Sequence, residues 1–138
     1  MRETLQPGLT AELVYTVPAD RTVPDLLPES DQFAALPPVL ATGYLVALVE
    51  WTCMKALVGH LDEDEQTLGI HVDLSHSAPT PVGSEVRIDV ALVAVDGRQL
   101  TFNVTARDEA AVICEGTHKR AAIDRPKFDT RLKGRSER

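Results

Sequence analysis

Cysteine and aromatic residues are scarce in this sequence. Only two of the 138 residues are cysteine, and 4% are aromatic. Two cysteines are too few for a disulfide scaffold or for the paired CxxC motifs of a metal site. We therefore expect Cys53 and Cys114 to be buried free thiols.

The sequence also lacks long apolar segments and an excess of positive charge. No stretch approaches the roughly 20 apolar residues that a membrane-spanning helix needs, and no apolar run follows the first charged residues. The formal net charge of -7 at pH 7 disfavours binding to the phosphates of nucleic acid. We expect a cytoplasmic protein with no nucleic-acid or membrane partner.

The last fourteen residues, RPKFDTRLKGRSER, depart from this acidic character. They carry six basic residues against two acidic ones. We interpret residues 125–138 as a solvated basic tail. The alternative is a local positive field for an anionic ligand such as the phosphates of a coenzyme.

What is present is the composition of an ordinary globular domain. Apolar residues make up 43% of the chain and charged residues 25%. A chain of this length buries roughly two-thirds of its unfolded surface, which is enough for one core and too little for two. We expect residues 1–138 to form a single domain.

The first half of the chain predicts one strand, one loop and one helix. Residues 9–17 alternate well enough for a strand, which Pro18 ends. Residues 22–38 contain four prolines, which predicts a folded, lid-like loop with at most a helical turn. Residues 39–61 are apolar around nearly the whole helical circumference, which is typical of a helix buried on most sides.

The second half predicts an antiparallel meander. Asp96-Gly97 marks a tight hairpin, and the four expected strands cover residues 67–77, 84–95, 99–107 and 111–123. This order of elements favours an α+β hot-dog fold, in which an antiparallel sheet wraps around one long central helix. A cystatin-like α+β roll is the alternative. The exposed sheet edge of a hot-dog fold predicts a homodimer.

Three polar residues stand out against apolar surroundings: Thr42 at the start of the helix, Glu50 within it, and His76 at the end of a strand. A buried carboxylate costs several kcal/mol unless it is paired, so Glu50 requires a partner. A Glu and a His in contact would form an acid/base or nucleophile/base pair. Structural alternatives are an ion pair or interface contact for Glu50, a hydrogen-bonded core histidine for His76, and a helix cap for Thr42.

Helix geometry limits how these residues meet. Eight residues of regular helix separate Thr42 from Glu50 by about 12 Å along the axis, so one unbroken helix cannot bring them together. Either the helix begins after Gly43 with a bend, or one protomer supplies Thr42 and its partner supplies Glu50. We favour the second arrangement, because it brings the free N–H groups of a helix start, which suit an oxyanion, close to the carboxylate.

Three segments of the sequence, PESDQFAALPPVLATGYLVALVEWTCMKAL, TLGIHVDLSHSAPTPVG and EGTHKRAAID, resemble the fluoroacetyl-CoA thioesterase family of hot-dog proteins. The likeness spans nearly the whole chain. It implies an enzyme that hydrolyses a short-chain acyl-CoA, with fluoroacetyl-CoA as one candidate. Such an enzyme needs no cofactor, because coenzyme A is part of the substrate.

The resemblance also implies roles for individual residues. Thr42, Glu50 and His76 match the catalytic set of the family. Glu50 would attack the thioester carbonyl or activate water there, and His76 would manage the protons. Gly69 matches a glycine whose backbone contacts the acyl group, and Arg120 matches a position near the active site.

The lid is where the sequence departs from the family. That family has two aromatic residues three positions apart in the lid, whereas this chain keeps Phe33 and has Leu36 at the second position. An aliphatic side chain changes the shape of the pocket, so hydrolysis of another short acyl-CoA is as well supported as that of fluoroacetyl-CoA. We place Gly43, beside Thr42, in the same substrate-binding set.

Two other functions are consistent with a hot-dog fold. One is a non-catalytic acyl-CoA-binding module, and the other is a hydratase or dehydratase, which would need an Asp/His pair. The catalytic set favours hydrolysis, because a binding pocket gains nothing from a buried carboxylate beside a thioester. His60, His71 and His118 do not have the spacing of metal ligands, so we expect no metal site.

Overall fold

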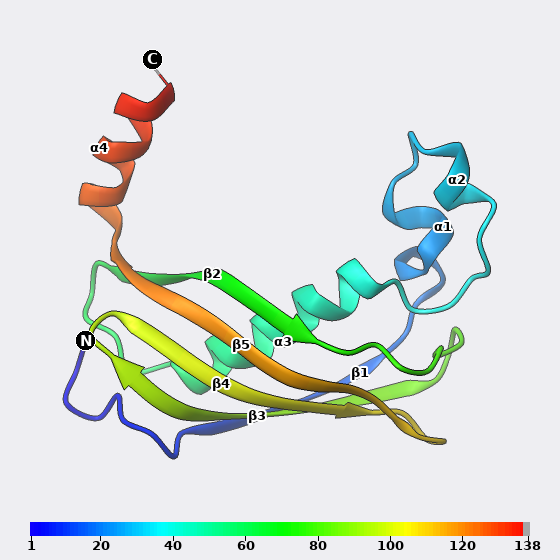
Figure 1. Ribbon diagram of the computed structural model, residues 1–138, viewed down its shortest axis with the longest axis horizontal. Helices are drawn as coiled ribbons and strands as arrows, with labels where there is room; N and C mark the ends of the chain where they lie inside the picture. The colour runs from blue at the N-terminus through cyan, green and yellow to red at the C-terminus, as the bar shows by residue number, and fades with distance from the viewer. Residues whose placement is uncertain (137–138) are drawn as a thin grey trace.

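A curled antiparallel sheet wraps around one helix in the computed structural model, which describes residues 1–136 (Figure 1). The strand order is β1-β3-β4-β5-β2, and each neighbouring pair is antiparallel. The five strands are β1 (Thr10–Thr16), β2 (Glu65–Leu74), β3 (Glu85–Asp96), β4 (Gln99–Arg107) and β5 (Val112–Asp124). The predicted α+β hot-dog fold is confirmed.

Helix α3 (Thr42–Ala56) lies in the curl of the sheet, as Figure 1 shows. One side of α3 buries Leu45, Leu48, Val49 and Cys53 in the core that it shares with the sheet. Each fully buried side chain of this size contributes roughly 1.5–3 kcal/mol to folding. Cys53 and Cys114 are both buried and free, as predicted.

The hairpin between β3 and β4 turns at the predicted dipeptide. Asp96 pairs with Gln99, and Gly97 has a φ of 58°. A positive φ at this position is typical of the tight turns that match the twist of paired strands. The three strands that follow β2 begin and end within a residue of their predicted bounds, whereas β2 begins two residues earlier and ends three residues earlier.

The predicted lid loop contains two single-turn helices, α1 (Val23–Leu26) and α2 (Asp31–Ala34), and follows the 3₁₀ turn η1 (Ala19–Arg21). A hydrogen bond of 2.7 Å from Arg21 Nε to the hydroxyl of Tyr44 ties η1 to α3. Figure 1 shows the lid projecting beyond the N-terminal end of α3. The lid is therefore an ordered structure anchored on the central helix.

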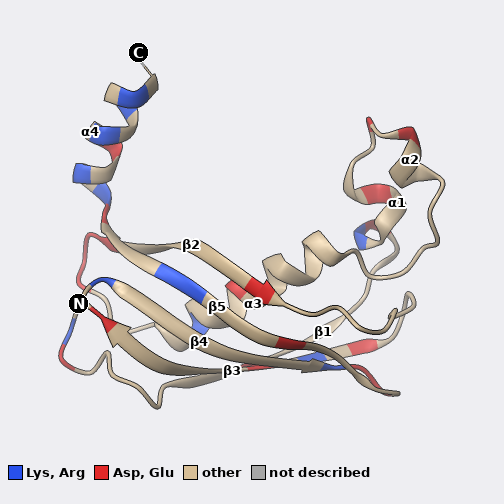
Figure 2. Cartoon of the chain, viewed as in Figure 1, with Lys and Arg blue, Asp and Glu red and all other residues tan. Residues whose placement is uncertain are grey.

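The predicted C-terminal tail is a helix as far as the structure describes it, which corrects the sequence analysis. Helix α4 (Arg125–Ser136) projects away from the sheet (Figure 1), and Asp124 Oδ1 accepts a hydrogen bond of 3.1 Å from the Lys127 N–H in its first turn. None of its residues is buried, and Lys and Arg residues recur along it (Figure 2). Residues 137–138 of the predicted tail lie outside the described residues.

None of the helices between residues 1 and 136 is both long and apolar enough to cross a membrane.

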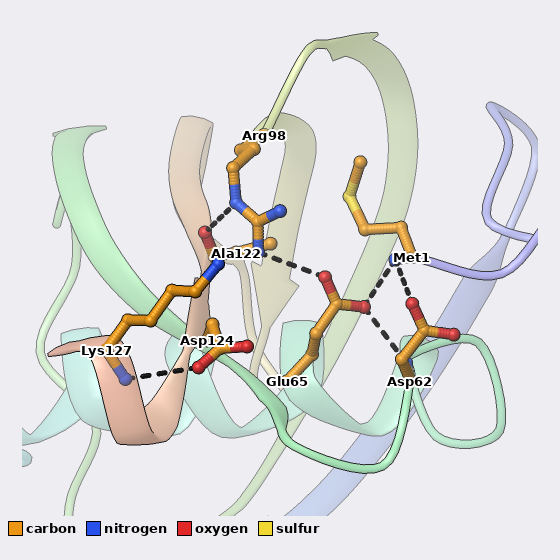
Figure 3. Close-up of polar contacts among 7 residues, drawn as sticks. All are labelled: Met1, Asp62, Glu65, Arg98, Ala122, Asp124 and Lys127. Atoms are coloured by element: carbon orange, nitrogen blue, oxygen red, sulfur yellow. Dashed lines mark hydrogen bonds and ion pairs between the residues drawn. The ribbon is translucent and has the colours of Figure 1, made fainter.

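A charged network secures the start of β2 (Figure 3). Glu65 accepts a hydrogen bond of 3.0 Å from Arg98, and it also pairs with the ammonium group of Met1. Burial by itself raises the pKa of Glu65, but the hydrogen bonds from Met1, from the Asp62 N–H and from Arg98 outweigh it and lower the pKa to about 2. This network fixes the edge strand of the sheet next to the β3–β4 hairpin.

Gly116 is required where β5 passes β2. Its φ is 147°, and a Cβ atom there would lie 1.9 Å from the carbonyl oxygen of Asp73. Because the obstacle is backbone, we expect Gly116→Ala to lower the free energy of unfolding by at least about 3 kcal/mol. Urea denaturation measures this loss.

Gly8→Ala is the matched control for Gly116→Ala. Gly8 also has a positive φ, 109°, but a Cβ atom there would meet nothing within 4 Å. We expect it to lose only the conformational part, about 1 kcal/mol. Equal losses from the two substitutions would contradict the close approach of β2 and β5.

Candidate active site

Thr42 and His76 form a hydrogen-bonded pair at the N-terminal end of α3. The hydroxyl of Thr42 lies 2.7 Å from His76 Nδ1. The predicted N-cap role of Thr42 is wrong, because Ala41 occupies the N-cap and Thr42 is the first helical residue. The alternative in which the helix begins after Gly43 is wrong for the same reason. The side chain of Thr42 is thus available to hold the imidazole.

His76 has the environment of a base. It lies two residues beyond β2, and burial lowers its pKa below the ordinary 6.5. Its Nε2 atom is buried and has no hydrogen-bond partner among residues 1–136. A neutral imidazole with one nitrogen held by Thr42 leaves the other nitrogen for proton transfer.

Glu50 is less buried than its apolar helix predicts. Its side chain is 36% exposed, and its Oε2 accepts a hydrogen bond of 3.2 Å from Arg120 Nη1. The predicted need for a partner is met by this ion pair. The prediction of full burial is wrong for the single chain, because Glu50 contacts Gly69 and Arg120 of the sheet but keeps part of its side chain exposed, as does Trp51 beside it.

Arg120 is the buried side of the ion pair. It extends from β5 and is only 2% exposed. Its Nε donates a hydrogen bond to the hydroxyl of Thr67, and its Nη2 donates one to the backbone carbonyl of the same residue, both at 2.8 Å. These two bonds form a fork that fixes the plane of the guanidinium. Arg120 therefore binds one side of the Glu50 carboxylate, and the other side remains exposed to solvent.

Gly69 lies directly beside the carboxylate. It pairs with Arg120 across β2 and β5, at a point where the register of the two strands shifts. A Cβ atom at Gly69 would lie 3.4 Å from Glu50 Oε1 and 3.2 Å from His118 Cε1. The missing side chain leaves the backbone of β2 accessible next to Glu50.

The structure divides the predicted site residues into two groups within the chain. Glu50, Gly69 and Arg120 lie together, whereas Thr42 and His76 meet at the start of α3, about 12 Å away along the helix axis. One chain alone does not bring the three predicted catalytic residues together.

The remaining predicted site residues, Phe33, Leu36 and Gly43, lie on the lid or in contact with it. Phe33 is half-buried on α2, and Leu36, which follows it, is exposed. A Cβ atom at Gly43 would lie 3.1 Å from Leu26 Cδ2, so Gly43 lets the lid pack closely on α3. Gly43 adjoins Thr42 in the first turn of α3, whereas Phe33 and Leu36 are on the lid, which projects beyond the N-terminal end of this helix (Figure 1).

Sequence reasoning missed Thr67 and His118. Both are buried, and both contact Arg120. A signal was present in β5, where His118 and Arg120 occupy alternate positions that face the core together with Ala122. Polar residues at core-facing positions of an alternating strand indicate a buried polar cluster.

Cys53 follows Glu50 by one helical turn but is unsuited to nucleophilic catalysis. Burial raises the pKa of its thiol to about 12. A thiol acts as a nucleophile in its thiolate form, so Cys53 stays inert at neutral pH. Glu50, by contrast, presents a partly exposed carboxylate on this part of the helix.

Solved structures place this fold in a defined class. A protein from Thermus thermophilus described as a thioesterase superfamily member superposes with a TM-score of 0.85 at 24% identity, covering 98% of each chain. A hot-dog-like protein from Thermanaerovibrio acidaminovorans gives 0.80 at 19% identity, covering 94% of this chain and 91% of the other. The fold is that of the hot-dog proteins.

Closer relatives define the family. The model of the fluoroacetyl-CoA-specific thioesterase family FlK matches residues 23–126. The fluoroacetyl-CoA thioesterase of Streptantibioticus cattleyicolor is 38% identical over 133 residues, which is 96% of each chain. A solved structure of FlK superposes with a TM-score of 0.92 at 37% identity, covering 96% of this chain and 98% of the other. The chain belongs to the fluoroacetyl-CoA-specific thioesterase family, which confirms the resemblance and the enzyme class predicted from the sequence.

Variants of FlK have also been solved with ligands. One is in complex with acetyl-CoA, and another is in complex with fluoroacetate and CoA.

Proposed function

We propose that this chain hydrolyses the thioester of a short-chain acyl-CoA to the free acid and coenzyme A. The observation that carries the proposal is the carboxylate of Glu50, held on one side by Arg120 and open on the other beside Gly69. Family membership and the complex of an FlK variant with acetyl-CoA support an acyl-CoA as the substrate. The reaction uses water and the side chains of the protein, with coenzyme A entering as part of the substrate.

We assign the chemistry to Glu50, His76 and Thr42. Glu50 either attacks the thioester carbonyl, forming an anhydride that water then hydrolyses, or removes a proton from the attacking water. In the anhydride route His76 accepts a proton from the water that hydrolyses the anhydride and passes it to the thiolate of coenzyme A. In the general-base route Glu50 takes the proton of the water, and His76 relays it to the departing thiolate. Thr42 orients the imidazole, and the N–H groups at the start of α3 stabilise the oxyanion.

A homodimer would complete this site. Strand β2 is at the edge of the sheet and exposes Leu68, Ile70 and Val72. Helix α3 exposes Trp51 and Met54 on the uncovered side. Apolar side chains along an unpaired strand are typical of an edge that is covered by another strand.

Pairing β2 with β2 of a second copy is the simplest way to cover this edge. A twofold axis makes the two strands antiparallel and sets the two α3 helices side by side in opposite directions. The Thr42–His76 end of one helix then approaches Glu50 of the other. This arrangement removes the separation that a single chain imposes.

We also propose that the reaction takes place in the cytoplasm. Acyl-CoA substrates and buried free thiols such as Cys53 and Cys114 both fit a reducing compartment.

Thiol release from a panel of acyl-CoA esters tests the proposed activity. We expect turnover of acetyl-, fluoroacetyl- or propionyl-CoA, with less of malonyl- and phenylacetyl-CoA. The acyl group remains open between fluoroacetyl and another short chain, because the lid has Leu36 in place of an aromatic residue. Tight binding without turnover of any ester would instead indicate an acyl-CoA-binding module.

A further inference from the structure

His118 lies behind the Glu50–Arg120 ion pair and takes no part in the chemistry proposed above. It extends from β5 two residues before Arg120 and is fully buried. Its two ring nitrogens face different partners. Nδ1 lies 2.9 Å from the backbone carbonyl oxygen of His71, and Nε2 lies 3.2 Å from Arg120 Nη1.

These two partners determine the protonation state of the ring. A carbonyl oxygen only accepts hydrogen bonds, so Nδ1 of His118 carries the proton and donates to His71. A guanidinium only donates, so Nε2 is unprotonated and accepts from Arg120. His118 is therefore the neutral tautomer with its proton on Nδ1.

The bond to His118 bears directly on Glu50, because both use the same nitrogen of Arg120. Nη1 carries two hydrogens and lies 3.2 Å from Glu50 Oε2 as well as 3.2 Å from His118 Nε2. The Nε and Nη2 atoms already donate to Thr67. His118 thus provides the acceptor that orients the second hydrogen of Nη1 away from the carboxylate.

Burial favours the neutral ring. It lowers the pKa of His118, and the positive charge of Arg120 lowers it further, while the bond to His71 and the charge of Glu50 act in the opposite direction. A protonated ring would set an N–H against the guanidinium and break the contact. The geometry of the cluster thus requires an uncharged acceptor at this position.

We propose that His118 is a positioning residue for Glu50: its neutral ring accepts a hydrogen bond from Arg120 and so fixes the guanidinium that holds the carboxylate. The proposal rests on the proposed role of Glu50 in hydrolysis. His118 acts through Arg120 and touches no reacting atom. Its loss therefore affects the chemical step rather than the binding of substrate.

Two substitutions at His118 distinguish the effect of losing the hydrogen-bond acceptor from the effect of losing the ring. His118→Phe keeps a ring but removes the acceptor, and we expect kcat to fall about 10-fold to 100-fold with KM changed less than about 2-fold. His118→Gln keeps a neutral acceptor near the position of Nε2, and we expect it to stay within about 5-fold of the wild type. His60→Ala is the matched control, because it removes an imidazole that lies beyond the C-terminal end of α3 and contacts the hydroxyl of Thr4.

Nitrogen-15 NMR of the imidazole rings tests the geometry without any assay of activity. We expect His118 in the wild-type protein at pH 7 to show a protonated Nδ1 and an unprotonated Nε2. A proton on Nε2 would overturn the proposal whether or not the protein is a thioesterase. If esters are hydrolysed but folded His118→Phe retains full kcat, or folded His118→Gln loses as much as His118→Phe, the proposal fails while the proposed function stands.

Discussion

Replacing Glu50 with glutamine is expected to lower kcat by at least about 10³-fold, which corresponds to about 4 kcal/mol of transition-state stabilisation. Glutamine has nearly the same shape and can still accept the hydrogen bond from Arg120 through its amide oxygen. It cannot attack a thioester or take a proton from water. The loss should therefore appear in the chemical step, measured as thiol release under saturating substrate, while the protein stays folded.

Glu12→Gln provides the control for this substitution. Glu12 forms an ion pair with Arg87, and both side chains are exposed, on the face of the sheet opposite to that of the buried neighbour Leu13. We expect no effect of Glu12→Gln on kcat. Exposed ion pairs of this kind contribute about 0–1 kcal/mol. If Glu50→Gln unfolds the protein, or leaves kcat unchanged, Glu50 serves as a structural partner of Arg120 and the proposed mechanism is wrong.

Replacing His76 with alanine should have the second-largest effect. General acid–base catalysis by a positioned side chain contributes typically 10²-fold to 10⁴-fold, so we expect a loss of kcat in this range. His60→Ala is a close control, because His60 Nδ1 also lies 2.7 Å from a threonine hydroxyl, that of Thr4, away from the site. Comparable losses from the two variants would show that the Thr42–His76 contact is structural.

The pH dependence of the wild type gives an independent measure of His76. Burial lowers its pKa below 6.5, so the neutral base persists at lower pH than for an exposed histidine. Activity falls as pH decreases through this pKa, because the protonated ring no longer accepts a proton. We expect the acidic limb of kcat/KM to lie below pH 6.5; a limb above this value would contradict the assigned role.

Local patterns in the sequence were sufficient to predict most of the strands and the central helix. Alternation of apolar residues predicts β3 and β4, and Asp96-Gly97 predicts the hairpin between them, because both signals depend on neighbouring residues. Helix α4 was missed because its sequence is strongly polar and has few apolar residues to show a helical period. Asp124, which accepts a hydrogen bond from the Lys127 N–H at the start of α4, lies one residue beyond the predicted strand.

The contacts of the candidate site could not be predicted from local sequence patterns, because they join residues that are distant along the chain. Glu50 stood out because a carboxylate in an apolar helix needs a partner, but that partner, Arg120, is 70 residues away along the chain. The register of β2 and β5 sets Arg120 opposite Gly69 and so brings it to the helix. Thr67 and His118 enter the site through the same register, which no local pattern specifies.

Mixing two inactive variants tests most directly whether the active site is shared between protomers. In a dimer of one His76→Ala chain and one Glu50→Gln chain, one of the two shared sites has both wild-type residues and the other has neither. Random exchange makes half of the dimers mixed, so activity should recover to about a quarter of the wild-type value. If each chain forms its own site, every site carries one substitution, and full subunit exchange with no recovery of activity would contradict the shared site.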